Sequence, residues 1–155
     1  MPYLLDAFDV GKYVMSEAGL ETRIQKRINA VLEEKDIPCS YVWAGDVIDW
    51  DSDCKVTVLS PVPEFDEYSK TDWNEWSLII RAEYANHSMI FTGDATVRSE
   101  QAAMLNNEKY LFDADVLKVP HHGSTTSSSL GFLEAVSPEC AITDSYKHLT
   151  LPTKA

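Results

Sequence analysis

The stretch WSLIIRAEYANHSMIFTGDATVRSEQAAMLNN, residues 76–107, holds three predicted elements in close succession. Its first two parts, WSLIIRAEY and SMIFT, are rich in apolar and aromatic residues and predict two strands. Only Ala85, Asn86 and His87 separate them, a spacing typical of a hairpin. The last part, VRSEQAAMLNN, predicts a helix. A hairpin followed by a helix indicates a sheet with helices packed outside it.

The sequence before this stretch adds a strand from Asp9 to Met15 and an amphipathic helix within ETRIQKRINAVLEEKDI, residues 21–37. Three short β-type runs follow within residues 40–61, SYVWAGDVIDWDSDCKVTVLSP. The helix is predicted to bury one face, formed by Ile24, Ile28, Val31 and Leu32. In the third run, Val56 and Val58 alternate with Lys55 and Thr57, which is typical of a half-buried strand.

After the opening stretch, strands are predicted at residues 115–119 and 140–143, with a helix at 130–136 between them. The complete order is therefore β-α-β-β-β-β-β-α-β-α-β. Clustered strands followed by strand–helix alternation predict an α/β fold, in which a mixed sheet carries helices on its outside.

The 155-residue chain has a formal net charge of −12, so bulk electrostatic capture of nucleic acid is not expected. Cations at a metal site could still supply local positive charge. The three cysteines are widely spaced, which argues against a disulfide framework and predicts buried or half-buried thiols. No apolar run approaches the roughly 20 residues of a membrane span, so we expect none within this sequence.

Asp94 follows the strand SMIFT through Thr92 and Gly93. A carboxylate at the C-terminal end of a strand faces the crevice where α/β sheets bind ligands. The alternative interpretation is that Asp94 only caps the helix that begins next.

The segment LKVPHHGS, residues 117–124, repeats this arrangement, since a strand ends in polar residues and glycine before the next helix. An imidazole and the Asp94 carboxylate at one sheet edge predict a metal site, because both are ligands of zinc and related metals. The alternative for the histidine pair is ordinary hydrogen bonding in a loop. The following run STTSSS is interpreted as a helix-capping loop whose hydroxyls could also contact a phosphate. His87 is predicted to lie on the surface.

These residues resemble the metallohydrolase domain of the ComEC competence family, which has the metallo-β-lactamase fold. The resemblance covers about residues 40–142 and rests on four stretches: AGDVIDWDSDCKVTVLSP, NEWSLIIRAEYANHSMIFTGDA, DADVLKVPHHGSTTS and FLEAVSPECAI. It implies an αββα sandwich with two divalent metal ions, zinc or manganese, at the sheet edge. It also implies metal-assisted hydrolysis of a phosphodiester, DNA included, by a bound water that ionises near neutral pH.

Carried over residue by residue, Asp94 matches the family's metal-bridging aspartate and His121 matches its late histidine ligand. His122 and Ser124 match neighbouring positions that assist by hydrogen bonding. Asn74 matches, together with Ser77, the polar pair that opens the hairpin strand near the site.

The chain departs from the family in lacking the H-x-H-x-D-H loop. Residues 1–144 therefore resemble the C-terminal half of the domain. One aspartate and one histidine cannot hold catalytic zinc, which needs about three protein ligands. We therefore expect the chain alone to bind metal weakly or not at all and to be inactive as a hydrolase.

The last residues, 145–155, depart as well, and SYKHLTLPT resembles a translated sequencing adapter. We interpret this segment as a non-native tail and leave His148 out of the site; a genuine divergent tail is the alternative.

Two other functions remain open. The same fold could act on a small ester or lactone, or the chain could be a metal-free structural or binding module. Parents of the ComEC type are attached to a membrane channel, whereas other relatives are soluble, so the sequence does not fix a localisation.

Overall fold

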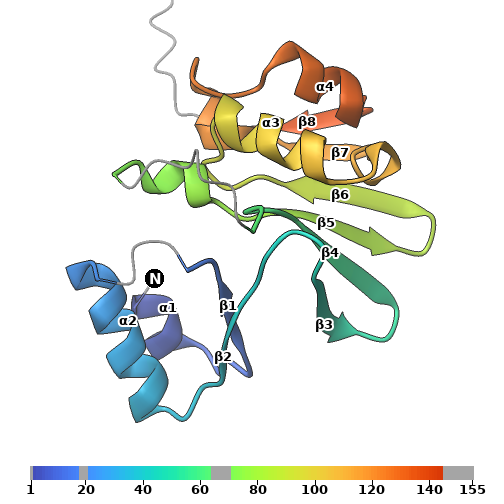
Figure 1. Ribbon diagram of the computed structural model, residues 1–155. Coiled ribbons are helices and arrows are strands. Elements are labelled where there is room, and N and C mark those ends of the chain that lie inside the picture. Colours follow the sequence, from blue (N-terminus) through green and yellow to red (C-terminus); the bar gives the residue numbers. More distant parts are fainter. Residues whose placement is uncertain (1, 18–20, 64–70, 145–155) are drawn as a thin grey trace, which may run out of the picture.

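The computed structural model describes residues 2–17, 21–63 and 71–144. Within these ranges the chain forms α-helices, β-strands and short 3₁₀ helices (η), shown in Figure 1. In chain order they are α1 (Pro2–Ala7), β1 (Tyr13–Met15), α2 (Arg23–Glu34), β2 (Cys39–Tyr41), β3 (Val47–Asp51), β4 (Cys54–Ser60), η1 (Trp73–Trp76), β5 (Ile79–Tyr84), β6 (His87–Phe91), α3 (Val97–Asn106), η2 (Lys109–Leu111), β7 (Val116–Lys118), η3 (Pro120–Gly123), α4 (Leu130–Val136) and β8 (Cys140–Ile142). From β1 onward the α-helices and strands follow the predicted order, and the α/β class is confirmed.

Six strands form the main sheet in the order β3-β4-β5-β6-β7-β8. The first four are antiparallel, because β3–β4 and β5–β6 are hairpins, whereas β6, β7 and β8 run parallel. Each parallel connection contains one α-helix, α3 between β6 and β7 and α4 between β7 and β8. The sheet is therefore mixed, as predicted, and its parallel half brings the C-terminal ends of three strands to one edge.

Helices α3 and α4 cover one face of this sheet (Figure 1). The main hydrophobic core lies beneath them, with Ile79, Ile90, Leu117 and Phe132 fully buried. Because sequential strand residues point to opposite faces, Val56 and Val58 belong to a second cluster on the other face. The strand ends that follow Ile90 and Leu117 are thus anchored by buried side chains.

The N-terminal elements form a separate part, drawn at the lower left of Figure 1. β1 and β2 pair in parallel as a two-stranded sheet of their own, and Leu5, Ile28 and Leu32 pack α1 against α2. The observed strand β1 covers only Tyr13–Met15 and is therefore shorter than the predicted strand, which begins at Asp9.

Helix α2 buries a narrower face than the sequence pattern predicts. Ile24 is 67% exposed, whereas Ile28 and Leu32 are buried. Gln25 is buried instead, and its side-chain amide donates to Asn29 Oδ1 at 2.8 Å and to the sulfur of Met15 at 3.3 Å. A helix that packs mainly against one neighbour buries a narrow stripe, so Ile24 falls outside the contact.

Two further expectations are corrected by burial. Thr57 is buried rather than exposed, because β4 is covered on both faces of the sheet from Val56 to Ser60. Cys54 is half-buried as expected, but Cys39 and Cys140 are exposed, each on a short strand at a sheet edge. Their sulfurs are free thiols.

None of the helices formed by residues 2–17, 21–63 and 71–144 has the length and apolar character that a membrane crossing requires. The predicted non-native tail at 145–155, with His148, lies outside the described residues.

Candidate functional site

The candidate site lies where the parallel strands β6 and β7 end. Met89 pairs with Val116 and Ile90 with Leu117, so the segments that follow the two strands emerge at the same sheet edge. Two hydrogen bonds join these segments. The hydroxyl of Thr92 donates to the carbonyl of Lys118 at 2.7 Å, and the His121 amide donates to the Gly93 carbonyl at 3.0 Å.

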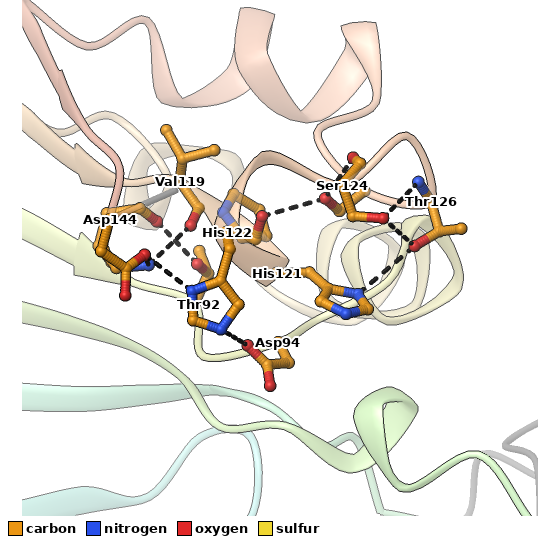
Figure 2. Close-up of polar contacts among 11 residues, drawn as sticks. Thr92, Asp94, Val119, His121, His122, Ser124, Thr126 and Asp144 are labelled. Carbon is orange, nitrogen blue, oxygen red and sulfur yellow. Dashed lines mark hydrogen bonds and ion pairs between the residues drawn. The ribbon is translucent and has the colours of Figure 1, made fainter. Parts of the chain in front are cut away.

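The backbone of both segments enters the left-handed region. Gly93 has a φ of 52°, and His121, His122 and Gly123 follow one another at 46°, 53° and 77°. Each non-glycine residue in this region costs about 1–2 kcal/mol, and such outliers cluster at functional sites. The left-handed turn directs the two imidazoles to different neighbours, as Figure 2 shows.

His122 lies between two carboxylates (Figure 2). Its Nε2 is 3.3 Å from Oδ1 of Asp94, and its Nδ1 is 2.8 Å from Oδ1 of Asp144. The ammonium of Lys118 is 3.2 Å from the same Asp144 oxygen. Hydrogen bonds from His122 and then from Lys118 lower the pKa of Asp144 to about 2. The result is a polar chain from Lys118 through Asp144 and His122 to Asp94.

The His121 side chain contacts the loop that follows it instead of Asp94 or Asp144. Its Nδ1 lies 3.4 Å from the hydroxyl of Thr126, and its ring centroid is 6.4 Å from that of His122 (Figure 2). The structure thus places His122, rather than His121, against Asp94. Asp94 itself does not cap α3, because Thr96 occupies the N-cap position and its amide donates to Ser99 Oγ.

Ser124 lies in the loop after the histidines. Its hydroxyl is 3.0 Å from that of Thr126 and accepts the Thr126 amide at 3.3 Å. The hydroxyls of these two residues therefore form a small network beside His121, in which Thr126 is exposed and Ser124 is half-buried. The run of hydroxyls also supplies the expected helix cap, since Ser129 Oγ accepts the Phe132 amide at the start of α4.

Asn74 lies in η1, where Asp72 caps its backbone amide and its own carbonyl accepts the Ser77 amide at 3.1 Å. Ser77 touches the turn that carries Asp94, because a Cβ placed on Gly93 would lie 3.4 Å from the Ser77 Cβ. Ser77 therefore borders the candidate site, and Asn74 is linked to it through this backbone hydrogen bond.

His87 is the first residue of β6 and is exposed, as predicted; its Nδ1 is 3.9 Å from Oδ2 of Asp115. Asp144 and Lys118 are not among the site residues predicted from the sequence. The signal was available, because Lys118 pairs with Ile142 in neighbouring parallel strands and Asp144 follows the end of β8. Asp144, like Asp94, is a carboxylate that follows the C-terminal end of a strand, where α/β sheets bind ligands.

The described side chains do not by themselves fit a metal centre. Across residues 2–17, 21–63 and 71–144, no three His, Cys, Asp or Glu side chains are grouped so as to hold a metal ion. Asp94 and His122 offer one carboxylate and one imidazole that contact each other. A catalytic zinc site needs about three protein ligands and an open position.

A scan against protein-family models finds no match for this chain. The chain is similar to ComE operon protein 3 of Bacillus subtilis (strain 168), with 32% identity over 145 residues, which are 94% of this chain and 18% of that protein. It is 37% identical over 94 residues to competence protein ComA of Neisseria gonorrhoeae, covering 57% of this chain and 13% of ComA. Recombination protein 2 of Haemophilus influenzae is 39% identical over 72 residues, 46% of this chain and 9% of that protein.

The chain thus spans less than a fifth of the length of these relatives. At low identity, the matches support a relationship to ComEC-like competence proteins.

Proposed function

We propose that this chain is a segment of a ComEC-type competence protein and contributes part of a metal-dependent site that hydrolyses phosphodiesters, with DNA as the substrate class. The observation that carries the proposal is the contact between Asp94 and His122 at the ends of two adjacent parallel strands. The similarity to competence proteins supports the same assignment at the level of the family.

The environment of His122 favours this histidine, more than His121, as the metal ligand. Histidines that bind metals usually hydrogen-bond a carboxylate or carbonyl through their second ring nitrogen, which fixes the ring. His122 has this arrangement, with Nδ1 held by Asp144 and Nε2 turned toward Asp94. In the proposal His121, Ser124 and Asn74 border the site and contact the substrate or its water.

The remaining ligands would be supplied by residues outside the described part of the chain, in the manner of the H-x-H-x-D-H loop. The six-stranded sheet with α3 and α4 on one face would then be one half of a metallo-β-lactamase sandwich. The net charge of −12 is consistent with a substrate held at the site itself rather than by the surface field.

The test is a Zn²⁺ and Mn²⁺ titration of the 155-residue chain by calorimetry, with Asp94→Asn, His121→Ala and His122→Ala variants. We expect weak binding that Asp94→Asn and His122→Ala weaken by about tenfold or more. The control His87→Ala removes an exposed imidazole outside the site and should leave the affinity unchanged. A metal affinity that stays unchanged in the Asp94→Asn variant would contradict the proposal.

Activity separates the substrate classes. The chain with added metal should not turn over bis(p-nitrophenyl) phosphate, because its ligand set is incomplete. A version joined to a segment that supplies the remaining ligands should cleave this phosphodiester and single-stranded DNA in preference to p-nitrophenyl acetate or a lactone. Faster cleavage of the acetate ester or the lactone would favour the small-ester alternative. If the joined protein folds but does not bind metal, the structural or binding module is favoured.

A further inference from the structure

Glu100, in the first turn of α3, is a glutamate with no solvent exposure. A buried carboxylate is costly unless hydrogen bonds replace its lost hydration. Here both oxygens are used, since Oε1 accepts the Ser128 amide at 2.6 Å and Oε2 accepts the Ser129 amide at 2.8 Å. Such short bonds to a carboxylate are about twice as strong as bonds between neutral groups.

The two amides belong to the far end of the loop that carries the histidines, residues 120–129. Ser128 has a φ of 62°, in the left-handed region, and Ser129 is the N-cap of α4. The Glu100 carboxylate therefore holds the loop at one of its left-handed residues, immediately before the next helix begins.

Within the loop, Ser127 connects this far end to the start. Its hydroxyl lies 3.1 Å from the Pro120 carbonyl and 3.0 Å from the Ser124 carbonyl, and Ser127 is buried. A second tie to α3 is the Val97 amide, which donates to the Thr126 carbonyl at 3.0 Å. The loop is thus cross-linked internally and attached to α3 at two positions one turn apart.

Helix α3 is also fixed to the other half of the site. Its N-cap, Thr96, lies two residues after Asp94, and the Ala95 amide donates to the Thr92 carbonyl at 3.0 Å. One rigid helix therefore begins at the Asp94 turn and holds, through Glu100, the loop with His121 and His122.

We propose that Glu100 is a positioning residue, which sets the place of the histidine loop relative to Asp94 without touching substrate or metal. The inference rests on the proposed function in taking Asp94 and the histidines as the site. A purely structural role would be to attach α4, but Phe132 and Val136, both fully buried, already anchor that helix in the core.

The test uses NMR on the full 155-residue chain without metal or substrate. Glu100→Gln keeps the side-chain volume but replaces one acceptor oxygen with an NH₂ group, which would face an amide donor. We expect the Ser128 and Ser129 amides to exchange about tenfold to a hundredfold faster than in the unsubstituted chain. We also expect the ring nitrogen signals of His122 to shift. The matched control, Glu134→Gln, changes an exposed glutamate of α4 and should alter neither.

Two results would overturn the inference. One is a folded Glu100→Gln variant in which the His122 ring signals shift no more than in Glu134→Gln. The other is rapid exchange of the Ser128 and Ser129 amides in the unsubstituted chain, a measurement that stands even if the variant fails to fold. Because neither readout involves metal or turnover, failure of the metal titration above would leave this result unchanged.

Discussion

Nδ1 of His122 lies 2.8 Å from Oδ1 of Asp144, and this contact is the first cause of the pKa of about 2 for that carboxyl group. A lowered carboxyl pKa means that the folded state favours the ionised form. The resulting stabilisation is fully present above the ordinary pKa of 3.8 and is lost as the pH falls through about 2. The Asp144 side chain is 55% exposed, so the contribution to the free energy of unfolding is small.

His122→Ala should therefore raise the pKa of Asp144 back toward 3.8, because it removes the largest cause of the shift. The measurement is a ¹³C NMR titration of the Asp144 carboxyl group between about pH 1.5 and about pH 6, a range that contains both values. Lys118→Met removes the second cause and should raise the pKa by less. An Asp144 pKa that stays near 2 without the imidazole would show that the two side chains do not interact in solution.

Gly93→Ala should destabilise the chain by about 1–2 kcal/mol, because the φ of 52° is costly for a residue with a Cβ. The added Cβ would lie 3.4 Å from the Cβ of Ser77, an ordinary van der Waals contact, so the expected cost comes from the backbone conformation. Urea unfolding followed by circular dichroism measures the loss.

The matched substitution is Gly11→Ala, where a Cβ meets nothing within 4 Å and φ is not in the left-handed region. It should change the free energy of unfolding by less than about 0.5 kcal/mol, or stabilise slightly through the unfolded chain. Equal effects of the two substitutions would contradict the role assigned to the Gly93 backbone.

The order of elements was predictable because it depends on local periodicity. The helix at Leu130–Val136 was predicted at its observed bounds, and the hairpin of β5 and β6 followed from two apolar runs with a short polar gap. The juxtaposition of the Asp94 turn and the histidine loop was also predictable, since adjacent parallel strands end at one sheet edge.

The orientation of the two histidines was not predictable from the sequence. It depends on the successive left-handed residues from His121 to Gly123, and no sequence pattern requires a histidine to adopt that conformation. The pairing of β1 with β2 could not be predicted either, because three-residue strands carry too little periodicity to specify a neighbour. The helix α1 was missed for the same reason, as its six residues span fewer than two turns.

Phe132→Ala should lower the free energy of unfolding by about 3–5 kcal/mol, because it leaves a cavity in the main core. Phe132 is fully buried and packs edge-on against Phe112, with ring centroids 6.2 Å apart. Leu130→Ala, in the same helix but 72% exposed, should cost less than about 1 kcal/mol. Similar losses in urea unfolding would mean that α4 does not pack on the sheet as described.

Ser99→Ala should cost about 1–2 kcal/mol, because the Ser99 hydroxyl is hydrogen-bonded in a fully buried place. It accepts the Thr96 amide at the start of α3 and donates to the Glu75 carbonyl at 2.9 Å, which ties the helix to η1. We expect lower stability in urea and faster hydrogen exchange in the first turn of α3. Ser52→Ala, in an exposed turn, should leave both readouts unchanged. If Ser99→Ala behaved like Ser52→Ala, the connection between α3 and the segment carrying Asn74 would not contribute to stability.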